Sequence, residues 1–150
     1  MAEVVSVAAY VLHKLGYSTT MKLQKIVYYS QAYSLVSRNR PLFTERIEAW
    51  VNGPVVPELF DLHRGKFVIS DGFFGNAAAS MLSDDRAVVD HVVARLGGFS
   101  GAELSSLSHS EAPWADARKG LAPTDRCASV ISLESMRSYY SSRPAGNPAF

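Results

Sequence analysis

The chain has 150 residues, of which 47% are hydrophobic, with a net charge of +1 and one cysteine, Cys127. This length suits one domain that buries most of its surface without disulfides, and the scattered charges argue against a nucleic-acid partner, which needs clustered Lys and Arg. A lone cysteine excludes an internal disulfide and is typical of the reducing cytoplasm, and no apolar run is long enough to predict a membrane contact.

The first part of the chain predicts two helices. Apolar residues recur at helical spacing from Ala2 to Leu15, and Gly16 is suited to end that helix. Thr20 can cap a second helix that extends to about Arg38. The stripe of this helix that we expect to face the core consists of Leu23, Ile26, Val27, Ser30 and Tyr33. Its outer side is expected to carry Lys22, Lys25 and Gln31.

A strand and a sharp corner follow the second helix. Apolar residues alternate with Glu48 and Trp50 from Ile47 to Val51, which is the period of a half-buried strand. The next residues, Asn52 to Pro54, break the strand, because glycine accepts a positive φ and proline donates no backbone hydrogen bond. Pro57 then opens a short helix to His63. The sequence therefore predicts a stiff corner that presents a fixed surface.

The remaining elements are short and mostly helical. Residues 66–70 can form a second strand, which we expect to pair with the strand at 47–51. Further helices are predicted after Ser83, after the capping box at 100–103, from Pro113 to Arg118 and after Ser132. The predicted fold is mainly α, of the α+β class: one compact multi-helix domain over residues 1–140 with one small β-hairpin, followed by a flexible tail over residues 141–150.

The polar residues His109 and Glu111 are the best candidates for catalysis. They flank a turn between two helices, where an imidazole beside a carboxylate would form an acid–base pair. The alternative is structural: these side chains, with Trp114 and Arg118, form a polar motif that satisfies helix ends and fixes the turn. We favour the structural interpretation, with a role in protein binding as the second choice, and predict no enzymatic activity.

Other chemistry finds no support in the residue pattern. The four histidines are dispersed and Cys127 has no neighbouring residue of ligand type, so no metal site is expected. The glycines form no phosphate-binding motif, and we expect no cofactor. Tyr28, Tyr29 and Tyr33 cannot all face inward from one helix; we expect Tyr29 inside and leave Tyr28 open. Trp50 is either covered by the second helix or exposed as an anchor for a partner.

Three blocks of sequence carry a resemblance to a known family. The blocks are MKLQKIVYYSQAY at 21–33, IEAWVNGPVVPE at 47–58 and LSSLSHSEAPWADAR at 104–118. In this order they resemble the SocA-like family, also called the Panacea domain, whose members include phage-associated GepA-like proteins. The resemblance extends from about Met21 to about Tyr140.

The resemblance implies an antitoxin of a two-gene toxin–antitoxin module. Proteins similar to this one bind a co-encoded toxin and block it, which needs protein–protein contact and no chemistry. An alternative within the family is a proteolytic adaptor that delivers the toxin to a AAA+ protease. The small enzyme that would use His109 and Glu111 remains a third possibility. Some family members carry an attached DNA-binding domain, and this chain shows no such segment, so DNA binding is not expected.

We expect the partner-binding site at the corner, where rigid backbone and aromatic residues coincide. Anchor residues of protein interfaces are commonly aromatic and clustered. The candidate contact residues are Tyr28, Gln31, Trp50, Asn52, Pro54 and Val55. A rival site is the irregular segment from Gly65 to Ser80, because a fixed motif cannot match the many shapes of unrelated toxins.

Overall fold

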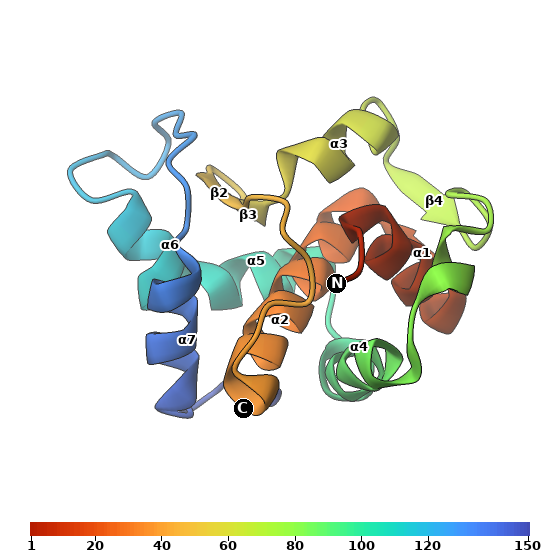
Figure 1. The fold of residues 1–150 in the computed structure, drawn as a ribbon. Helices are drawn as coiled ribbons and strands as arrows, with labels where there is room; N and C mark the ends of the chain where they lie inside the picture. The colour runs from red at the N-terminus through yellow and green to blue at the C-terminus, as the bar shows by residue number, and fades with distance from the viewer.

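Helix α2 (Thr20–Arg38) passes through the middle of the fold in the computed structural model, which describes all 150 residues (Figure 1). Four other helices pack against it: α1 (Val4–Leu15), α4 (Ser83–Leu96), α5 (Gly101–His109) and α7 (Leu133–Ser141). Because neighbours surround it, α2 is buried around nearly its whole circumference. Lys25 and Gln31 are therefore buried, and the prediction that they lie on an outer side was wrong.

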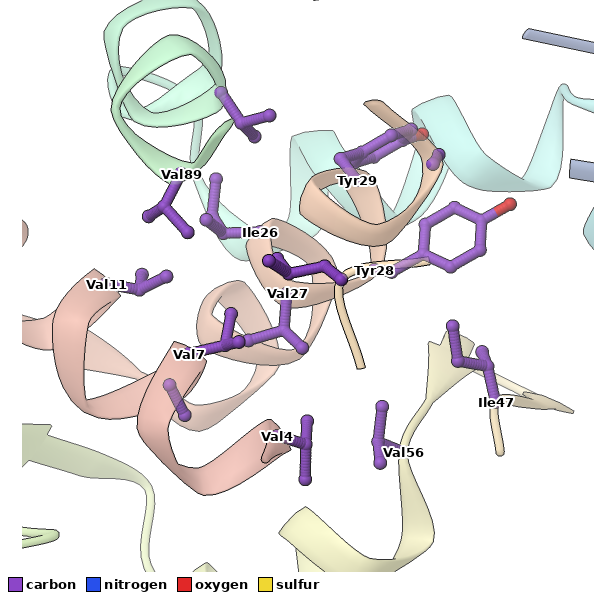
Figure 2. Close-up of a cluster of buried hydrophobic side chains, with 14 of the residues drawn as sticks. Val4, Val7, Val11, Ile26, Val27, Tyr28, Tyr29, Ile47, Val56 and Val89 are labelled. Carbon is purple, nitrogen blue, oxygen red and sulfur yellow. The ribbon is translucent and has the colours of Figure 1, made fainter. Parts of the chain in front are cut away.

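The core is one cluster of side chains from helices that are distant in sequence. Figure 2 shows Val7 and Val11 of α1 facing Val27 of α2, with Val89 of α4 near Ile26. The hydrophobic effect favours this arrangement, since each of these helices presents an apolar face that water would otherwise cover. Tyr28 and Tyr29 belong to the same cluster.

The strands form two separate antiparallel pairs rather than one hairpin. Strand β1 (Tyr17–Thr19) pairs with β4 (Val68–Ser70), and β2 (Glu48–Trp50) pairs with β3 (Gly53–Val55). The mainly α, α+β fold class is confirmed. The expected pairing of 66–70 with 47–51 was wrong, because the strand at β2 turns back on the residues that follow it directly. Closing so short a loop costs less chain entropy than pairing with a distant segment.

Two shorter helices and one 3₁₀ helix complete the fold. Helix α3 (Pro57–His63) follows β3, and α6 (Ala112–Ala117) follows α5, with a 3₁₀ helix, η1 (Ala77–Ser80), before α4. The predicted capping box is present, with Ser100 Oγ accepting from the Glu103 amide at 3.1 Å. None of the helices combines the length and the apolar character needed to cross a bilayer.

The segment after α7 packs back on the fold, in contrast to the loose tail expected from its composition. Asn147 and Ala149 are buried, and the Phe150 ring stacks on Tyr140 with centroids 4.6 Å apart. His91 of α4 contacts the carbonyl of Ala149 at 3.0 Å. These contacts hold the C-terminus beside α7 and α4.

Candidate functional site

The β2–β3 hairpin forms the corner predicted from the sequence, and it has two different faces. Ile47 and Ala49 are buried in the core, as the alternation predicted. On the other face, the Glu48 carboxylate accepts hydrogen bonds from Arg46 Nε at 2.7 Å and from Trp50 Nε1 at 2.9 Å. The Trp50 ring packs edge-on against Phe60 of α3, 5.0 Å between centroids, and stays half-buried.

Helices α5 and α6, with the residue that follows α6, hold the backbone of the hairpin through three side-chain donors. Ser105 Oγ donates to the Asn52 carbonyl at 2.6 Å. Trp114 Nε1 donates to the Trp50 carbonyl at 2.7 Å. The third donor, Arg118, reaches the carbonyl of the residue before Trp50 at 3.0 Å. The third sequence block therefore acts as a clamp on the second, which is a structural role.

Arg118 also fixes the loop that runs beside the hairpin. Its guanidinium lies over the Trp114 ring, 4.9 Å from the centroid, and donates to three loop carbonyls, the shortest to Asp125 at 2.6 Å. The loop then pairs with β2 through the amide of Ala49 and the carbonyl of Ser129 at 2.9 Å. In Figure 1 this loop stands next to β2 and β3.

Gln24 of α2 fixes the other end of the corner. Its Oε1 accepts from the Val56 amide at 2.9 Å, and its Nε2 lies 2.9 Å from His63 Nε2. Since the amide nitrogen can only donate, His63 Nε2 accepts, and the ring is neutral. Burial lowers the pKa of His63, which also favours the neutral ring.

A pocket of about 880 Å³ lies between α2, the hairpin, α3 and the loop at 126–128. This volume is within the usual range of ligand-binding clefts. Aromatic, amide and charged side chains line it together. The lining residues are Thr20, Met21, Gln24, Lys25, Glu48, Trp50, Val51, Asn52, Val55, Phe60, His63, Arg64, Arg126, Cys127 and Ala128.

Lys25 is the buried cation of this pocket. The residue is 1% exposed, and its stem passes under the hairpin turn, where Gly53 leaves room for it. A Cβ at Gly53 would lie 2.4 Å from Lys25 Cε, and the φ of Gly53 is +118°, so both space and backbone favour glycine there. Burial lowers the pKa of the Lys25 ammonium to about 7.

His109 and Glu111 do not form an acid–base pair. Glu111 accepts from Tyr29 at 2.5 Å, from Tyr140 at 2.8 Å and from Asn147 at 2.8 Å, and burial raises its pKa. His109 instead stacks on Trp114, 3.9 Å between centroids, and burial lowers the pKa of its imidazole. Each group contacts a different set of neighbours, which fits the structural interpretation of this polar motif.

The structure divides the six candidate contact residues into two sets. Trp50, Asn52 and Val55 line the pocket, and of these Asn52 is the exposed one. Tyr28 and Pro54 are buried, so their side chains make no contact with a partner in this conformation. Tyr28 bonds Tyr140 through their hydroxyls at 2.9 Å, which puts it with Tyr29 inside the fold.

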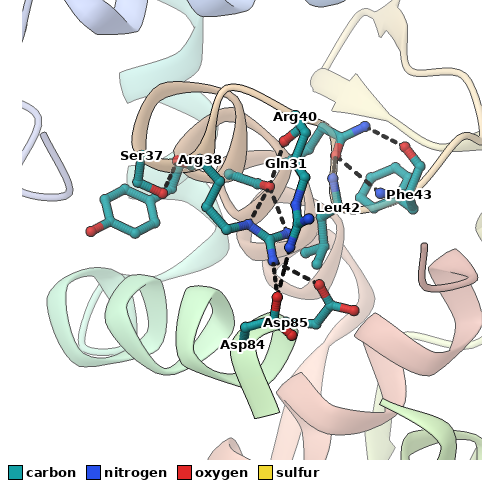
Figure 3. Close-up of polar contacts among 10 residues, drawn as sticks. Gln31, Ser37, Arg38, Arg40, Leu42, Phe43, Asp84 and Asp85 are labelled. Carbon is teal, nitrogen blue, oxygen red and sulfur yellow. Dashed lines mark hydrogen bonds and ion pairs between the residues drawn. The ribbon is translucent and has the colours of Figure 1, made fainter. Parts of the chain in front are cut away.

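Gln31 is likewise buried, and its side chain binds the backbone of a neighbouring loop. Figure 3 shows its side chain joined to the loop at Leu42 and Phe43. Oε1 accepts from both amides, at 2.7 and 3.2 Å, and Nε2 donates to the Phe43 carbonyl at 2.7 Å. The bonds satisfy buried backbone groups at the start of the segment that leads into β2.

Sequence reasoning missed several pocket residues. Lys25 was assigned to the outer side of its helix, and Phe60, Arg64 and Arg126 were not singled out, although they line the pocket. The sequence does contain Lys25 in the first block and Gly53 in the second, but a single sequence does not show that these two residues are in contact. No group of three or more His, Cys, Asp or Glu side chains is arranged to hold a metal ion.

The rival segment is also exposed. Phe67 is 76% exposed, and Val68 and Phe73 are exposed beside it, around β4 and the turns that follow. Such a group of large apolar side chains is a candidate contact surface in its own right.

Comparison with known proteins places the three blocks in one family. The family model described as "Antitoxin SocA-like, Panacea domain" matches residues 23–115. A curated relative, "Antitoxin SocA" of Caulobacter vibrioides (strain NA1000 / CB15N), is 27% identical over 108 residues, which cover 64% of this chain and 57% of the relative. The chain thus spans little more than half the length of that relative. No solved structure matches.

Proposed function

Because this chain belongs to the antitoxin SocA-like, Panacea domain family, we propose that it neutralises a co-encoded toxin by binding it directly. The family supports an antitoxin role, and direct binding is the mechanism that the site favours. We propose the corner around the pocket as the contact surface, and the cytoplasm as the place where the two proteins meet.

The pocket at the corner is the observation that carries this proposal. Ser105 and Trp114 donate hydrogen bonds to the backbone around it and Gln24 accepts one, so a partner would meet a surface that is already ordered. Binding to a preorganised surface loses less conformational entropy, which favours affinity. Half-buried Trp50 and Phe60 supply the aromatic contact area that interface anchors commonly use.

The arrangement of the polar motif favours binding over catalysis. Glu111 is held by three donors, and His109 is stacked on Trp114, so neither presents a free acid–base group to a substrate. Without such a group, this chain would block a toxin by covering part of the toxin's surface rather than by modifying it. No observation favours a protease partner over direct binding, and the adaptor role therefore has no support beyond the first resemblance.

Substitutions at the pocket rim test the proposal. Asn52→Ala and Arg126→Ala change exposed side chains and are expected to leave the fold intact. In cells that co-express the toxin, the double variant should fail to restore growth and should not co-purify with it. Arg137→Ala, on the exposed side of α7, is the matched control and should neutralise fully. A folded double variant that still neutralises would exclude the corner.

The rival segment needs its own variant. Phe67→Ser and Phe73→Ser together remove the exposed rings near β4 without touching the pocket. If the corner is the contact surface, this variant should neutralise the toxin as well as the unmodified chain does. Loss of neutralisation by this variant, with the rim variant unaffected, would move the contact surface to residues 65–80.

A further inference from the structure

Lys25 lies deep in the fold without a counter-charge. It lines the pocket at 1% exposure, and burial alone lowers its pKa to about 7, with no hydrogen bond or carboxylate to oppose that effect. Taking an ammonium out of water without pairing it destabilises the folded protein. A ligand that supplied the missing anion would recover that cost on binding.

The channel that holds the lysine depends on the hairpin turn. Gly53 leaves no spare space above the stem: a Cβ there would meet Cε at 2.4 Å and the Ser108 hydroxyl at 3.0 Å. Gly53 also keeps a φ that other residues rarely adopt. The corner motif and the lysine of α2 are therefore one unit, in which the turn positions the ammonium at the pocket.

The remaining charges make the pocket attractive to an anion. The Glu48 carboxylate is already paired with Arg46 at 2.7 Å, so it does not serve as the counter-charge of Lys25. Arg126 is exposed at the rim and has no ion pair. Arg64, on the α3 side, shares its charge with Asp61 at 3.0 Å. A positive cleft with low-dielectric walls concentrates negative groups.

We propose that this pocket takes up a carboxylate from an acidic side chain of the protein partner, with the Lys25 ammonium as its anchor. The inference rests on the proposed function and adds the chemistry of the partner's anchor residue. Trp50, Phe60 and Val55 would enclose the aliphatic part of an Asp or Glu side chain. One ammonium suits a carboxylate, whereas phosphate sites usually add a group of backbone amides.

Few other groups near Lys25 titrate close to neutral pH. His63 on α3 and His109 on α5 both have lowered pKa values, because burial disfavours the charged imidazole and the charge of Lys25 acts in the same direction. Glu48 is ion-paired on β2. Cys127 has a lowered thiol pKa, because hydrogen bonds from Ser129 together with the charge of Arg118 outweigh its burial. Cys127→Ser removes that group, and the titrations of the unmodified chain are repeated with this variant to separate the contribution of the thiol.

The test is isothermal titration of the full chain with its co-encoded toxin between about pH 6.5 and pH 8.5. The carboxylate binds the protonated amine, so Kd should rise roughly 25-fold over this range as Lys25 loses its proton. Lys25→Met should bind at least about 10-fold more weakly at the lower pH and lose the pH dependence. Lys119→Met, an exposed lysine, should match the unmodified chain.

Proton uptake gives a second readout. Titrations near pH 8 in buffers of different ionisation enthalpy should show uptake of roughly 0.9 proton per complex, and none for Lys25→Met. A Lys25→Met protein with unchanged affinity and pH response would overturn the inference and leave direct binding intact. If the unmodified chain does not bind the toxin, the proposed function fails and the inference with it.

Small anions distinguish the source of the carboxylate. Acetate and inorganic phosphate are titrated separately into the unmodified chain and into Lys25→Met. If the site belongs to the partner, millimolar acetate should weaken toxin binding only slightly, and phosphate should do no more. Tight, Lys25-dependent binding of either anion with no effect on the toxin would show that the pocket serves a small molecule, and would overturn the assignment to a partner side chain.

Discussion

Glu111 and Lys25 are both buried ionisable groups, yet their surroundings differ completely. The Glu111 carboxylate accepts from three donors, on α2, α7 and the C-terminal segment, whereas the Lys25 ammonium has no acceptor and no carboxylate beside it. Buried polar groups in proteins are normally paired, so the first region closes on itself and holds elements together. The second is open to a pocket. For this reason our proposal puts the partner contact at the unpaired Lys25 rather than at the more polar cluster around Glu111.

The largest expected effect comes from opening the closed region. Glu111→Ala leaves the hydroxyls of Tyr29 and Tyr140 and the amide of Asn147 without their acceptor, and should lower the free energy of unfolding by about 3 kcal/mol. Urea denaturation measures it. Glu134→Ala, an exposed carboxylate on α7, should cost less than about 0.5 kcal/mol. Equal effects of the two substitutions would abolish the contrast between the regions.

The open region around Lys25 should instead make the free energy of unfolding depend on pH. The pKa of Lys25 is about 7 when folded and near its ordinary value of 10.5 when unfolded, so the unfolded chain binds more protons between these values. Stability from this group is therefore complete above the unfolded pKa and is lost as the pH falls toward 7. The free energy of unfolding should rise by about 2 kcal/mol from about pH 7 to pH 9.

The variant Lys25→Met tests whether this pH dependence of stability comes from Lys25. Without the ammonium, the part of the rise that comes from this group should disappear, and the variant should be at least as stable as the unmodified chain at pH 7. Urea midpoints of both proteins across the pH range provide the measurement. A rise of the same size in Lys25→Met would mean that Lys25 is not the buried cation that the structure places at the pocket.

The contact between the hairpin turn and Lys25 is expected to contribute an effect of similar size. Gly53→Ala forces a side chain onto a φ of +118° and against Lys25 Cε, which should cost about 2 kcal/mol of unfolding free energy. In a Lys25→Ala background the clash is relieved, and the same substitution should cost about 1 kcal/mol less. This double-mutant cycle compares denaturation curves. Full additivity would show that glycine and lysine act independently.

The smallest effect concerns the hydrogen bond by which α5 holds the tip of the hairpin. Ser105→Ala removes the hydrogen bond to the Asn52 carbonyl and should cost about 1 kcal/mol of stability. Because the hairpin tip then loses one of its supports, affinity for the toxin should fall as well. Ser106→Ala, the exposed neighbour in α5, is the matched control. A loss of stability without a loss of affinity would separate the clamp from the binding surface.

The sequence by itself determined the features that depend on neighbouring residues. The capping box at Ser100, the positive φ at Gly53 and the proline that opens α3 are consequences of local backbone chemistry, and they were predicted. The order of the helices followed from apolar spacing for the same reason. The three motif blocks indicated the family, and the corner was recognised as the place where a rigid surface forms.

Only the tertiary structure decided which side of each element faces a neighbour. Helix α2 is enclosed by other elements, so Gln24, Lys25 and Gln31 lie inside, and periodicity cannot show this because it assumes one buried face. The partner of β4 was likewise a distant strand, β1. The pocket exists because residues from four separate segments meet there, and the missing counter-charge at Lys25 becomes visible only when every neighbour is in place.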